Sequence, residues 1–211
     1  MFHRIDSNPG IKCEEAQKAD RGYGLVLQEF DPENDNFLFL DIDGVMHPFG
    51  TMEAYFEDGK FIIKKNDKSW IENGEPFSRL PFLIHLADRW DLKIVLHSAW
   101  RLAYNLTELK RELPKELMDR LVGVTDPLEV HRFPSITKFI SGTGVKKFMI
   151  VDDDTKDFPW NVVKSPKFVG TDPKLGMNAE VIVKLSLGFQ CQNQDSKTTS
   201  ATSVVPVPAA S

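Results

Sequence analysis

The chain has 211 residues, of which 41% are hydrophobic and 27% are charged, and its net charge is −5. This length and composition predict a soluble globular protein with one domain of good size. The negative charge excludes a long-range positive field that would attract nucleic acid or an anionic membrane. No apolar run reaches the roughly 20 residues that a membrane span needs, so we expect no membrane partner.

The two ends of the chain differ in composition from its middle. Residues 1–23 are polar and contain no apolar segment, which predicts a flexible N-terminal arm and not a secretory signal. Residues 189–211 are rich in Ser, Thr, Gln and Pro, which favours a disordered C-terminal tail. We therefore expect the folded domain over residues 24–188. Cys13 and Cys191 lack metal-ligand spacing and favour a reducing, cytoplasmic location.

Short apolar runs predict buried parallel strands. They are FLFLDI at 37–42, LKIVLH at 92–97 and KFMIVD at 147–152. Between the first two, YFEDGKFIIKK at 55–65 predicts a β-hairpin that turns at Asp58–Gly59.

Helical patterns separate and follow these strands. They lie at residues 78–90, at 105–121 with a break before Pro114, at 134–140, and at 178–189. Asn105 and Glu108 have the spacing of a capping box. Alternation of strands and helices predicts an α/β sheet with right-handed crossovers.

Polar residues stand where the predicted strands end. Asp41 and Asp43 end the first strand, Ser98 follows the second, and Asp152 and Asp153 end the third. In α/β sheets ligands bind beyond the carboxyl ends of the strands, so these groups should share one crevice. Several carboxylates in one place need a neutralising cation, and oxygen ligands favour Mg²⁺.

Other interpretations of these residues are weaker. A single aspartate at a strand end is often a cap or turn residue, but two clusters at two strand ends favour metal. A calcium-binding EF-hand is excluded because Gly44 is at the fourth loop position and Met52 at the twelfth. The five histidines have no paired spacing, which argues against zinc and favours surface or hydrogen-bonded core positions.

Four segments together resemble the motif set of the haloacid dehalogenase (HAD) superfamily. They are FLFLDIDGV, KIVLHSAWR, a basic residue that opens a helix, and FMIVDDD. The chain is similar to compact, capless, phosphatase-like members, including HAD domains of RNA-repair proteins, over residues 37–187. The segment FVGTDPKLGMNAEVIVKL resembles the last strand, loop and helix of that group. The resemblance implies a Rossmann-like three-layer α/β sandwich with a mostly parallel central sheet, a small β-hairpin flap and no large cap.

The resemblance also implies roles for individual residues. Asp41 would be the nucleophile that forms an aspartyl-phosphate, and Asp43 the general acid and base. Ser98 would donate a hydrogen bond to the phosphoryl group. Arg132 would supply the fixed cation, with Lys138 as the rival.

The implied metal is Mg²⁺, with Asp41, Asp43, Asp152 and Asp153 as the expected ligands. The metal would also explain how Asp41 stays ionised among like charges. In the family, an aspartate at the position of Asp43 marks phosphatases and mutases, which favours transfer of phosphate to water.

The expected function follows from the motifs and the small size of the hairpin. We expect a Mg²⁺-dependent phosphomonoesterase with an open site, acting on a bulky phosphorylated substrate such as a nucleic-acid end or a phosphoprotein. Trp100 and Arg101 could stack a base or bind a second phosphate, although a core tryptophan is favoured for Trp100. A small-molecule, nucleotide-type phosphatase and a non-catalytic HAD-fold binding module stay open as alternatives. Nothing in the sequence indicates the oligomeric state.

Overall fold

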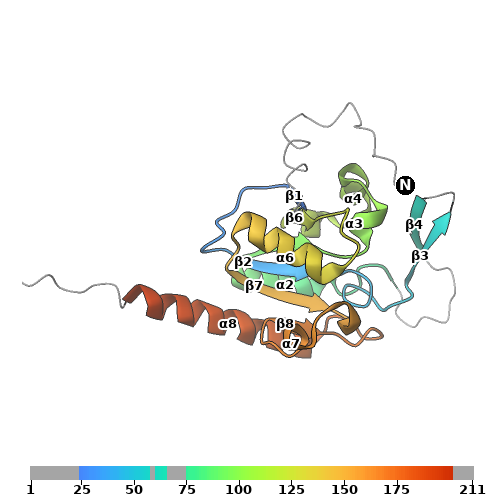
Figure 1. Cartoon of the computed structure of the whole chain (residues 1–211). Helices are drawn as coiled ribbons and strands as arrows, with labels where there is room; N and C mark the ends of the chain where they lie inside the picture. Colours follow the sequence, from blue (N-terminus) through green and yellow to red (C-terminus); the bar gives the residue numbers. More distant parts are fainter. Residues whose placement is uncertain (1–23, 58–59, 66–74, 202–211) are drawn as a thin grey trace, which may run out of the picture.

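The computed structural model describes residues 24–57, 60–65 and 75–201. Its centre is a six-stranded sheet in the order β1-β6-β5-β2-β7-β8 (Figure 1). β1 pairs antiparallel with β6, and the other pairings are parallel. The strands are β1 (Gly24–Val26), β2 (Asn36–Leu40), β5 (Leu92–Leu96), β6 (Leu121–Thr125), β7 (Lys147–Asp152) and β8 (Phe168–Gly170).

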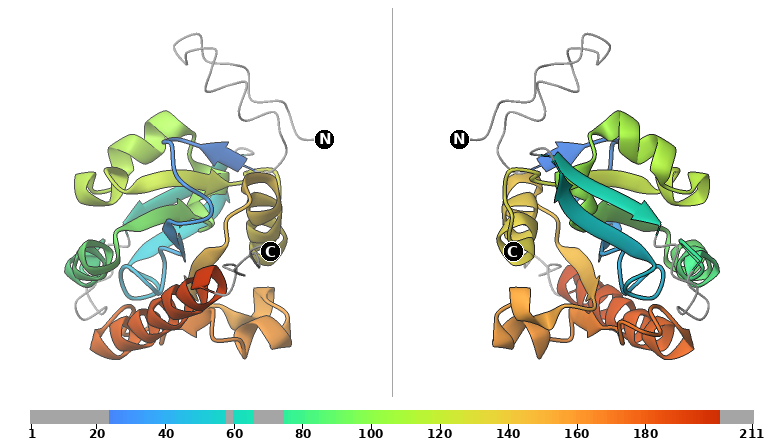
Figure 2. Two further views of the ribbon diagram at one scale, coloured as in Figure 1. Left: turned by 90° about the vertical axis from the view of Figure 1, so that its left-hand side faces the viewer. Right: turned by 90° about the vertical axis from the view of Figure 1, so that its right-hand side faces the viewer.

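Helices cover both faces of this sheet, which gives the predicted three-layer α/β sandwich. Helices α2 and α8 lie on one face, and α6 lies on the other with the short α7 beside it (Figure 2). No helix in the described part of the chain is long and apolar enough to cross a lipid bilayer. The helices are α2 (Leu80–Trp90), α3 (Trp100–Ala103), α4 (Leu106–Glu112), α5 (Lys115–Met118), α6 (Arg132–Thr143), the 3-10 helix η1 (Thr155–Asp157), α7 (Trp160–Val163) and α8 (Ala179–Ala201).

The central strand β2 supplies side chains to both layers of the core. Leu38 and Leu40 belong to the apolar cluster that includes α2 and α8, and Phe37 and Phe39 belong to the cluster that includes α6. Successive side chains of a strand point to opposite faces, so an uninterrupted apolar run is what a strand between two helical layers requires. The ring of Phe39 meets the ring of Phe139 in α6 edge-on at 5.8 Å.

The predicted strands and helices are present with small shifts at their ends, except that the last helix is much longer than expected, and the capping box of Asn105 and Glu108 is formed. Two strands were not expected. β6 occupies part of a stretch that we interpreted as a helix followed by a loop, and β1 precedes the first predicted strand. β1 has only three residues, and β6 directly follows the predicted helix and has Gly123 within its apolar run, which weakens a strand pattern.

The predicted hairpin is present as β3 (Met52–Glu57) and β4 (Lys60–Lys65), which pair antiparallel. Its turn at Asp58–Gly59 lies outside the described residues. The Tyr104 hydroxyl donates a hydrogen bond to the Ile63 carbonyl at 3.0 Å, so the hairpin is attached to the segment that follows β5. In the described residues between β2 and α2 this hairpin is the largest insertion, which agrees with the absence of a large cap.

Helix α8 corrects the expected start of the disordered tail, because it continues to Ala201 and not to residue 188. Phe189 is fully buried, and its ring packs on Trp90 at 6.0 Å. Gln192 exchanges hydrogen bonds with the Phe148 backbone, and Asn193 donates to Asn36. Amide side chains that suggested disorder therefore bind the sheet. Residues 1–23 and 202–211 lie outside the described part, so their expected disorder stays a prediction.

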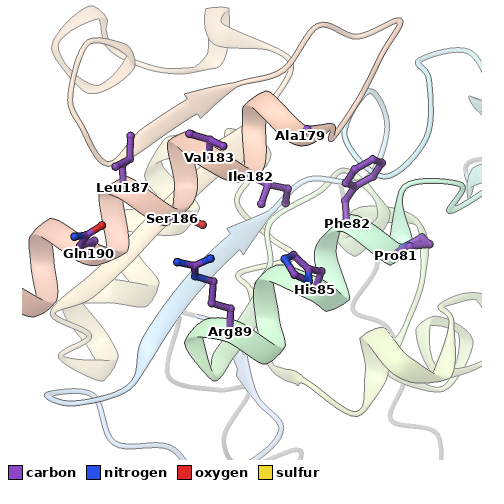
Figure 3. A pocket seen from close by; sticks show the side chains of 10 residues that line it. All are labelled: Pro81, Phe82, His85, Arg89, Ala179, Ile182, Val183, Ser186, Leu187 and Gln190. Carbon is purple, nitrogen blue, oxygen red and sulfur yellow. The ribbon is translucent and has the colours of Figure 1, made fainter.

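A groove of about 660 Å³ lies between α2 and α8 (Figure 3). Phe82, Arg89 and Leu187 are among its lining residues, all of which come from these two helices. None of the aspartates at the strand ends lines it, so this groove is separate from the candidate active site.

Candidate active site

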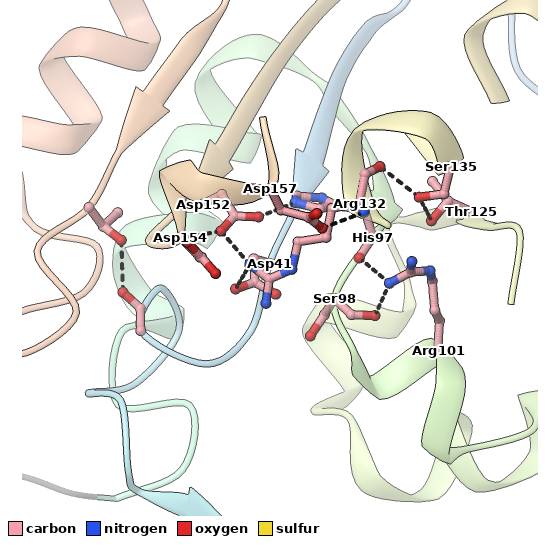
Figure 4. A network of polar contacts seen from close by, with 12 residues as sticks. Asp41, His97, Ser98, Arg101, Thr125, Arg132, Ser135, Asp152, Asp154 and Asp157 are labelled. Atoms are coloured by element: carbon pink, nitrogen blue, oxygen red, sulfur yellow. Dashed lines mark hydrogen bonds and ion pairs between the residues drawn. The ribbon is translucent and has the colours of Figure 1, made fainter. Parts of the chain in front are cut away.

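The carboxyl ends of β2, β5 and β7 bring the predicted polar residues together (Figure 4). Asp41 follows β2, Ser98 follows β5, and Asp152 is the last residue of β7. All three are fully buried. Because these strands are parallel neighbours in register, their ends meet at one edge of the sheet, as expected for ligand sites in α/β folds.

Three carboxylates form a compact cluster at this edge. One oxygen from each of Asp41, Asp152 and Asp153 lies within 4.8 Å of the others. Gly44 makes room for Asp153, since a Cβ at position 44 would lie 2.3 Å from Oδ2 of Asp153. Gly44 also has a φ of +75°, which favours glycine.

Arg132 is the cation that faces this cluster. Its Nη1 lies 2.5 Å from an oxygen of Asp152 and 3.3 Å from Oδ2 of Asp41. Its backbone N–H, in the first turn of α6, donates to Asp157 at 2.6 Å. Asp157 therefore holds the backbone at the start of α6, and Asp152 at the end of β7 holds the guanidinium.

Burial and mutual repulsion make the cluster hold protons more strongly than ordinary aspartates. Burial, followed by repulsion from Asp152, raises the pKa of Asp41 to about 6. Burial raises the pKa of Asp152 to about 7 although Arg132 opposes the shift, and burial and its neighbours raise the pKa of Asp153 to about 7. Burial disfavours the Arg132 cation, but the surrounding carboxylates outweigh it and raise its pKa.

This cluster has the properties of a site for a hard divalent cation. Both oxygens of Asp41 are buried, and neither accepts a hydrogen bond from the described residues. Buried carboxylates without donors are costly unless a cation compensates them. The donor set is oxygen only, which fits Mg²⁺. Asp41, Asp152 and Asp153 are the residues that can hold the ion.

Asp43 differs from our expectation as a fourth metal ligand. In the described part of the chain its carboxylate does not belong to the cluster. Instead Oδ1 lies 3.0 Å from His47 Nε2, and Oδ2 accepts a hydrogen bond from Trp100 Nε1 at 2.9 Å. Asp43 is still close enough for its charge to contribute to the raised pKa of Asp41. Its carboxylate is thus beside the cluster and has its own partners.

The remaining predicted residues have distinct positions. Ser98 Oγ accepts the Trp100 backbone N–H at 3.4 Å, which leaves its hydroxyl proton available to a ligand. Of the two candidate cations, Arg132 faces Asp41, whereas Lys138 pairs with Glu129 at 2.8 Å. The geometry therefore favours Arg132 over Lys138 as the cation of the site.

His97 is a buried part of the site to which we assigned no role from the sequence. Its Nε2 lies 2.8 Å from Oδ2 of Asp152, and burial lowers the pKa of His97 to about 3, so the ring is neutral. The single ring proton is on Nε2 and is donated to the carboxylate. A histidine that ends an apolar strand beside a motif serine was the only signal in the sequence.

Arg101 is not a surface residue, and its guanidinium donors are directed to the protein itself. It is buried, and its side chain donates to backbone carbonyls of the loops that follow β5 and β6. It thereby ties these loops together, and Trp100 is buried beside it as a core tryptophan. The carbonyls are those of His97, Ser98, Asp126, Glu129 and Val130.

The mostly parallel sheet, its crossover helices and the aspartates at the ends of β2 and β7 define a HAD-type fold of the phosphatase and hydrolase class. Within that class the chain matches, over residues 37–182, the family described as "HAD domain in Swiss Army Knife RNA repair proteins". The chain belongs to this family, which confirms the resemblance predicted from its motifs. None of the curated proteins compared with the chain matches it.

Proposed function

We propose that the protein is a Mg²⁺-dependent phosphomonoesterase that forms an aspartyl-phosphate on Asp41. The observation that carries this proposal is the environment of Asp41. Its carboxylate is fully buried, accepts no hydrogen bond from the described residues, and lies 3.3 Å from the Arg132 guanidinium. A carboxylate without competing donors is an available nucleophile, and the nearby cation can balance the charge of a phosphoryl group.

The proposed reaction has two steps. In the first, an oxygen of Asp41 bonds to phosphorus while the ester oxygen leaves and takes a proton from Asp43. In the second, water loses a proton to Asp43 and attacks the phosphorus of the aspartyl-phosphate. The bond to Asp41 breaks, inorganic phosphate leaves, and both aspartates return to their starting states.

Other residues of the site would support these steps. The Arg132 guanidinium, which faces Asp41, and the Ser98 hydroxyl would stabilise phosphoryl oxygens. His97 and Arg132 orient Asp152 through its two oxygens. When bound to Asp41, Asp152 and Asp153, Mg²⁺ would neutralise the carboxylates and the phosphoryl group.

The proposed substrate is bulky, with a polynucleotide end as the first candidate. Two observations support this choice: the described insertions at the site are a two-stranded hairpin and short helices, and the family description refers to RNA repair. The net charge of −5 argues for contact with a short end and not with an extended nucleic acid. The low cysteine content supports a reducing location such as the cytoplasm.

The test is a substrate panel with the wild-type protein, Asp41→Asn and the control Asp91→Asn. Asp91 is exposed before β5 and has a positive φ that asparagine tolerates. The panel contains 3′-phosphorylated oligonucleotides, phosphopeptides and small phosphate esters, each with and without Mg²⁺. We expect Mg²⁺-dependent release of phosphate, fastest from the oligonucleotide, by the wild type and Asp91→Asn only. Activity of Asp41→Asn would contradict the mechanism. Turnover of small esters alone would contradict the proposal of a bulky substrate and favour a small-molecule phosphatase.

A further inference from the structure

The Asp43 carboxylate is held by a donor on each of its two oxygens. His47 Nε2 lies 3.0 Å from Oδ1, and Trp100 Nε1 donates to Oδ2 at 2.9 Å. His47 and Trp100 are buried, whereas the Asp43 side chain is 20% exposed. The two donors therefore contact the carboxylate from the interior of the protein and leave its other side open to a ligand.

The ring proton of His47 can be located from its second contact. The Phe77 backbone N–H donates to Nδ1 of His47 at 3.3 Å, so Nδ1 is an acceptor and the proton is on Nε2. The indole N–H of Trp100 is a donor only. Neither partner can therefore take a proton from Asp43. Each carboxylate oxygen keeps a second lone pair, and any proton of Asp43 is exchanged on the open side.

The two donors are themselves fixed by an aromatic cluster. The Phe77 ring lies edge-on to His47 and to Trp100, at 5.6 Å in both cases, and Trp100 meets Tyr104 at 5.5 Å. The Tyr104 hydroxyl in turn bonds to Ile63 of the hairpin. Phe77 has a φ of +57°, which is an unfavourable backbone conformation for a residue with a side chain. Strain of this kind persists where the surrounding contacts enforce it, and here it places the Phe77 N–H on His47.

We propose that His47 and Trp100 are positioning residues that set the orientation of Asp43 for proton transfer to the leaving group. This inference rests on the proposed phosphatase function. A carboxylate rotates readily about its terminal torsion, and proton transfer requires a defined distance and direction. A donor on each oxygen removes that rotation. The hairpin supports this arrangement through the hydrogen bond of Ile63 with Tyr104.

The test compares variants on two substrates that differ in their leaving group. Trp100→Phe and His47→Phe remove one donor each and keep a ring, and His47→Gln restores an N–H donor. Trp90→Phe is the matched control, since it removes an indole hydrogen bond to Ser186 on the far pair of helices. p-Nitrophenyl phosphate has a leaving group that departs without a proton, whereas an alkyl phosphate needs one.

We expect kcat/KM for the alkyl phosphate to fall about 10-fold to 100-fold in Trp100→Phe and His47→Phe, because general acid catalysis is impaired. The loss on p-nitrophenyl phosphate is at least about 5-fold smaller, because that ester depends less on the acid. His47→Gln recovers most of the difference between the substrates, and Trp90→Phe shows none. In an Asp43→Asn background the same changes have no further effect on the alkyl phosphate.

The outcomes separate this inference from the function on which it rests. Equal losses on both substrates, or no loss on either, would overturn the positioning role while the active wild type keeps the phosphatase proposal. A wild-type protein without activity on any phosphate ester would overturn the function, and the positioning role with it. If Trp100→Phe does not fold, as judged by circular dichroism, the comparison of His47→Phe with His47→Gln decides.

Discussion

Asp41 and Asp43 are separated by one residue, yet their surroundings are opposite. The Asp41 carboxylate is fully buried among acidic groups and accepts no hydrogen bond from the described residues. The Asp43 carboxylate is partly exposed and has a neutral donor on each oxygen. In the proposed function the first aspartate is thus available to a metal and a phosphoryl group, and the second is oriented by the protein.

This contrast teaches how two identical side chains can have different roles in one site. A nucleophile must be charged and free of competing donors, and its charge must be balanced only when metal and substrate are present. An acid and base must keep one orientation while it gains and loses a proton. The predictions that follow test whether the two surroundings produce these two roles, in order of decreasing effect.

The first prediction separates the two aspartates by the step that each controls. Asp41→Asn should show no phosphorylated enzyme and no measurable turnover, because the attacking carboxylate is missing. Asp43→Asn should still be phosphorylated by p-nitrophenyl phosphate, and its turnover should fall about 10²-fold to 10⁴-fold because water is no longer activated. Mass spectrometry of the quenched protein measures the trapped intermediate. Phosphorylation of Asp41→Asn, or the same defect in both variants, would contradict the division of roles.

The second prediction concerns the cation beside Asp41. Arg132→Met should lower kcat about 10²-fold to 10³-fold, because a fixed charge next to the phosphoryl group is lost. Lys138→Met is the matched control and should change kcat less than about 2-fold, since an exposed ion pair contributes little. Steady-state kinetics of both variants gives the answer. A larger fall in kcat for Lys138→Met than for Arg132→Met would show that Lys138 is the cation of the site.

The third prediction uses the raised pKa values of the cluster. Each folded-state pKa is above the ordinary 3.8, at about 6 for Asp41 and about 7 for Asp152 and Asp153, so the folded protein retains protons that the unfolded chain releases. Without metal, stability from this source is present at low pH and is lost as pH rises through the window from about 4 to about 7. Mg²⁺ binds the deprotonated cluster, so its effect on Tm should be larger at about pH 8 than at about pH 5.5.

Thermal denaturation with and without Mg²⁺ at the two pH values measures this effect. Asp153→Asn serves as the comparison, because it removes one carboxylate of the cluster and should reduce the Mg²⁺-dependent rise in Tm. An equal rise in Tm at both pH values would show that these carboxylates are not the metal ligands.

The smallest expected effect is on the free energy of unfolding, which the two substitutions should change in opposite directions. In the absence of metal at about pH 8, Asp41→Asn should raise the free energy of unfolding on the order of 1–3 kcal/mol, since it removes a buried charge among like charges. Asp43→Asn should lower it by about 1 kcal/mol, because one of its two hydrogen bonds is lost. Urea denaturation measures both. A change in the same direction for both variants would mean that the surroundings of the two aspartates do not differ as described.

Much of the fold could be predicted because β2, β5 and β7 are apolar runs that a two-sided core requires. β1 could not, because three residues show no pattern, and β6 could not, because Gly123 interrupts its apolar run directly after a helix. The length of α8 was also missed. The segment after Phe189 is polar in sequence, and Gln192 in it forms hydrogen bonds with the Phe148 backbone that the sequence did not indicate.

The site was predicted to a similar depth. The convergence of Asp41, Ser98 and Asp152 follows from parallel strands that end at one edge, and it needs no further information. The contact of His97 with Asp152 could not be foreseen, nor could those of Arg101 with the loop after β6, because these partners are 25 or more residues away in the chain. The placement of Asp43 outside the carboxylate cluster likewise depends on Trp100, which is 57 residues away.

The sequence by itself determined the order of the buried strands β2, β5 and β7, the main helices between them and the aspartates at the strand ends, because periodicity and motif spacing are local properties. Tertiary structure alone decided which of those carboxylates is left without donors and which is held. That decision depends on partners from distant segments and on burial, and both arise only when the layers pack. The physical reason is that a carboxylate acquires its pKa and its orientation from its surroundings and not from its position in the chain.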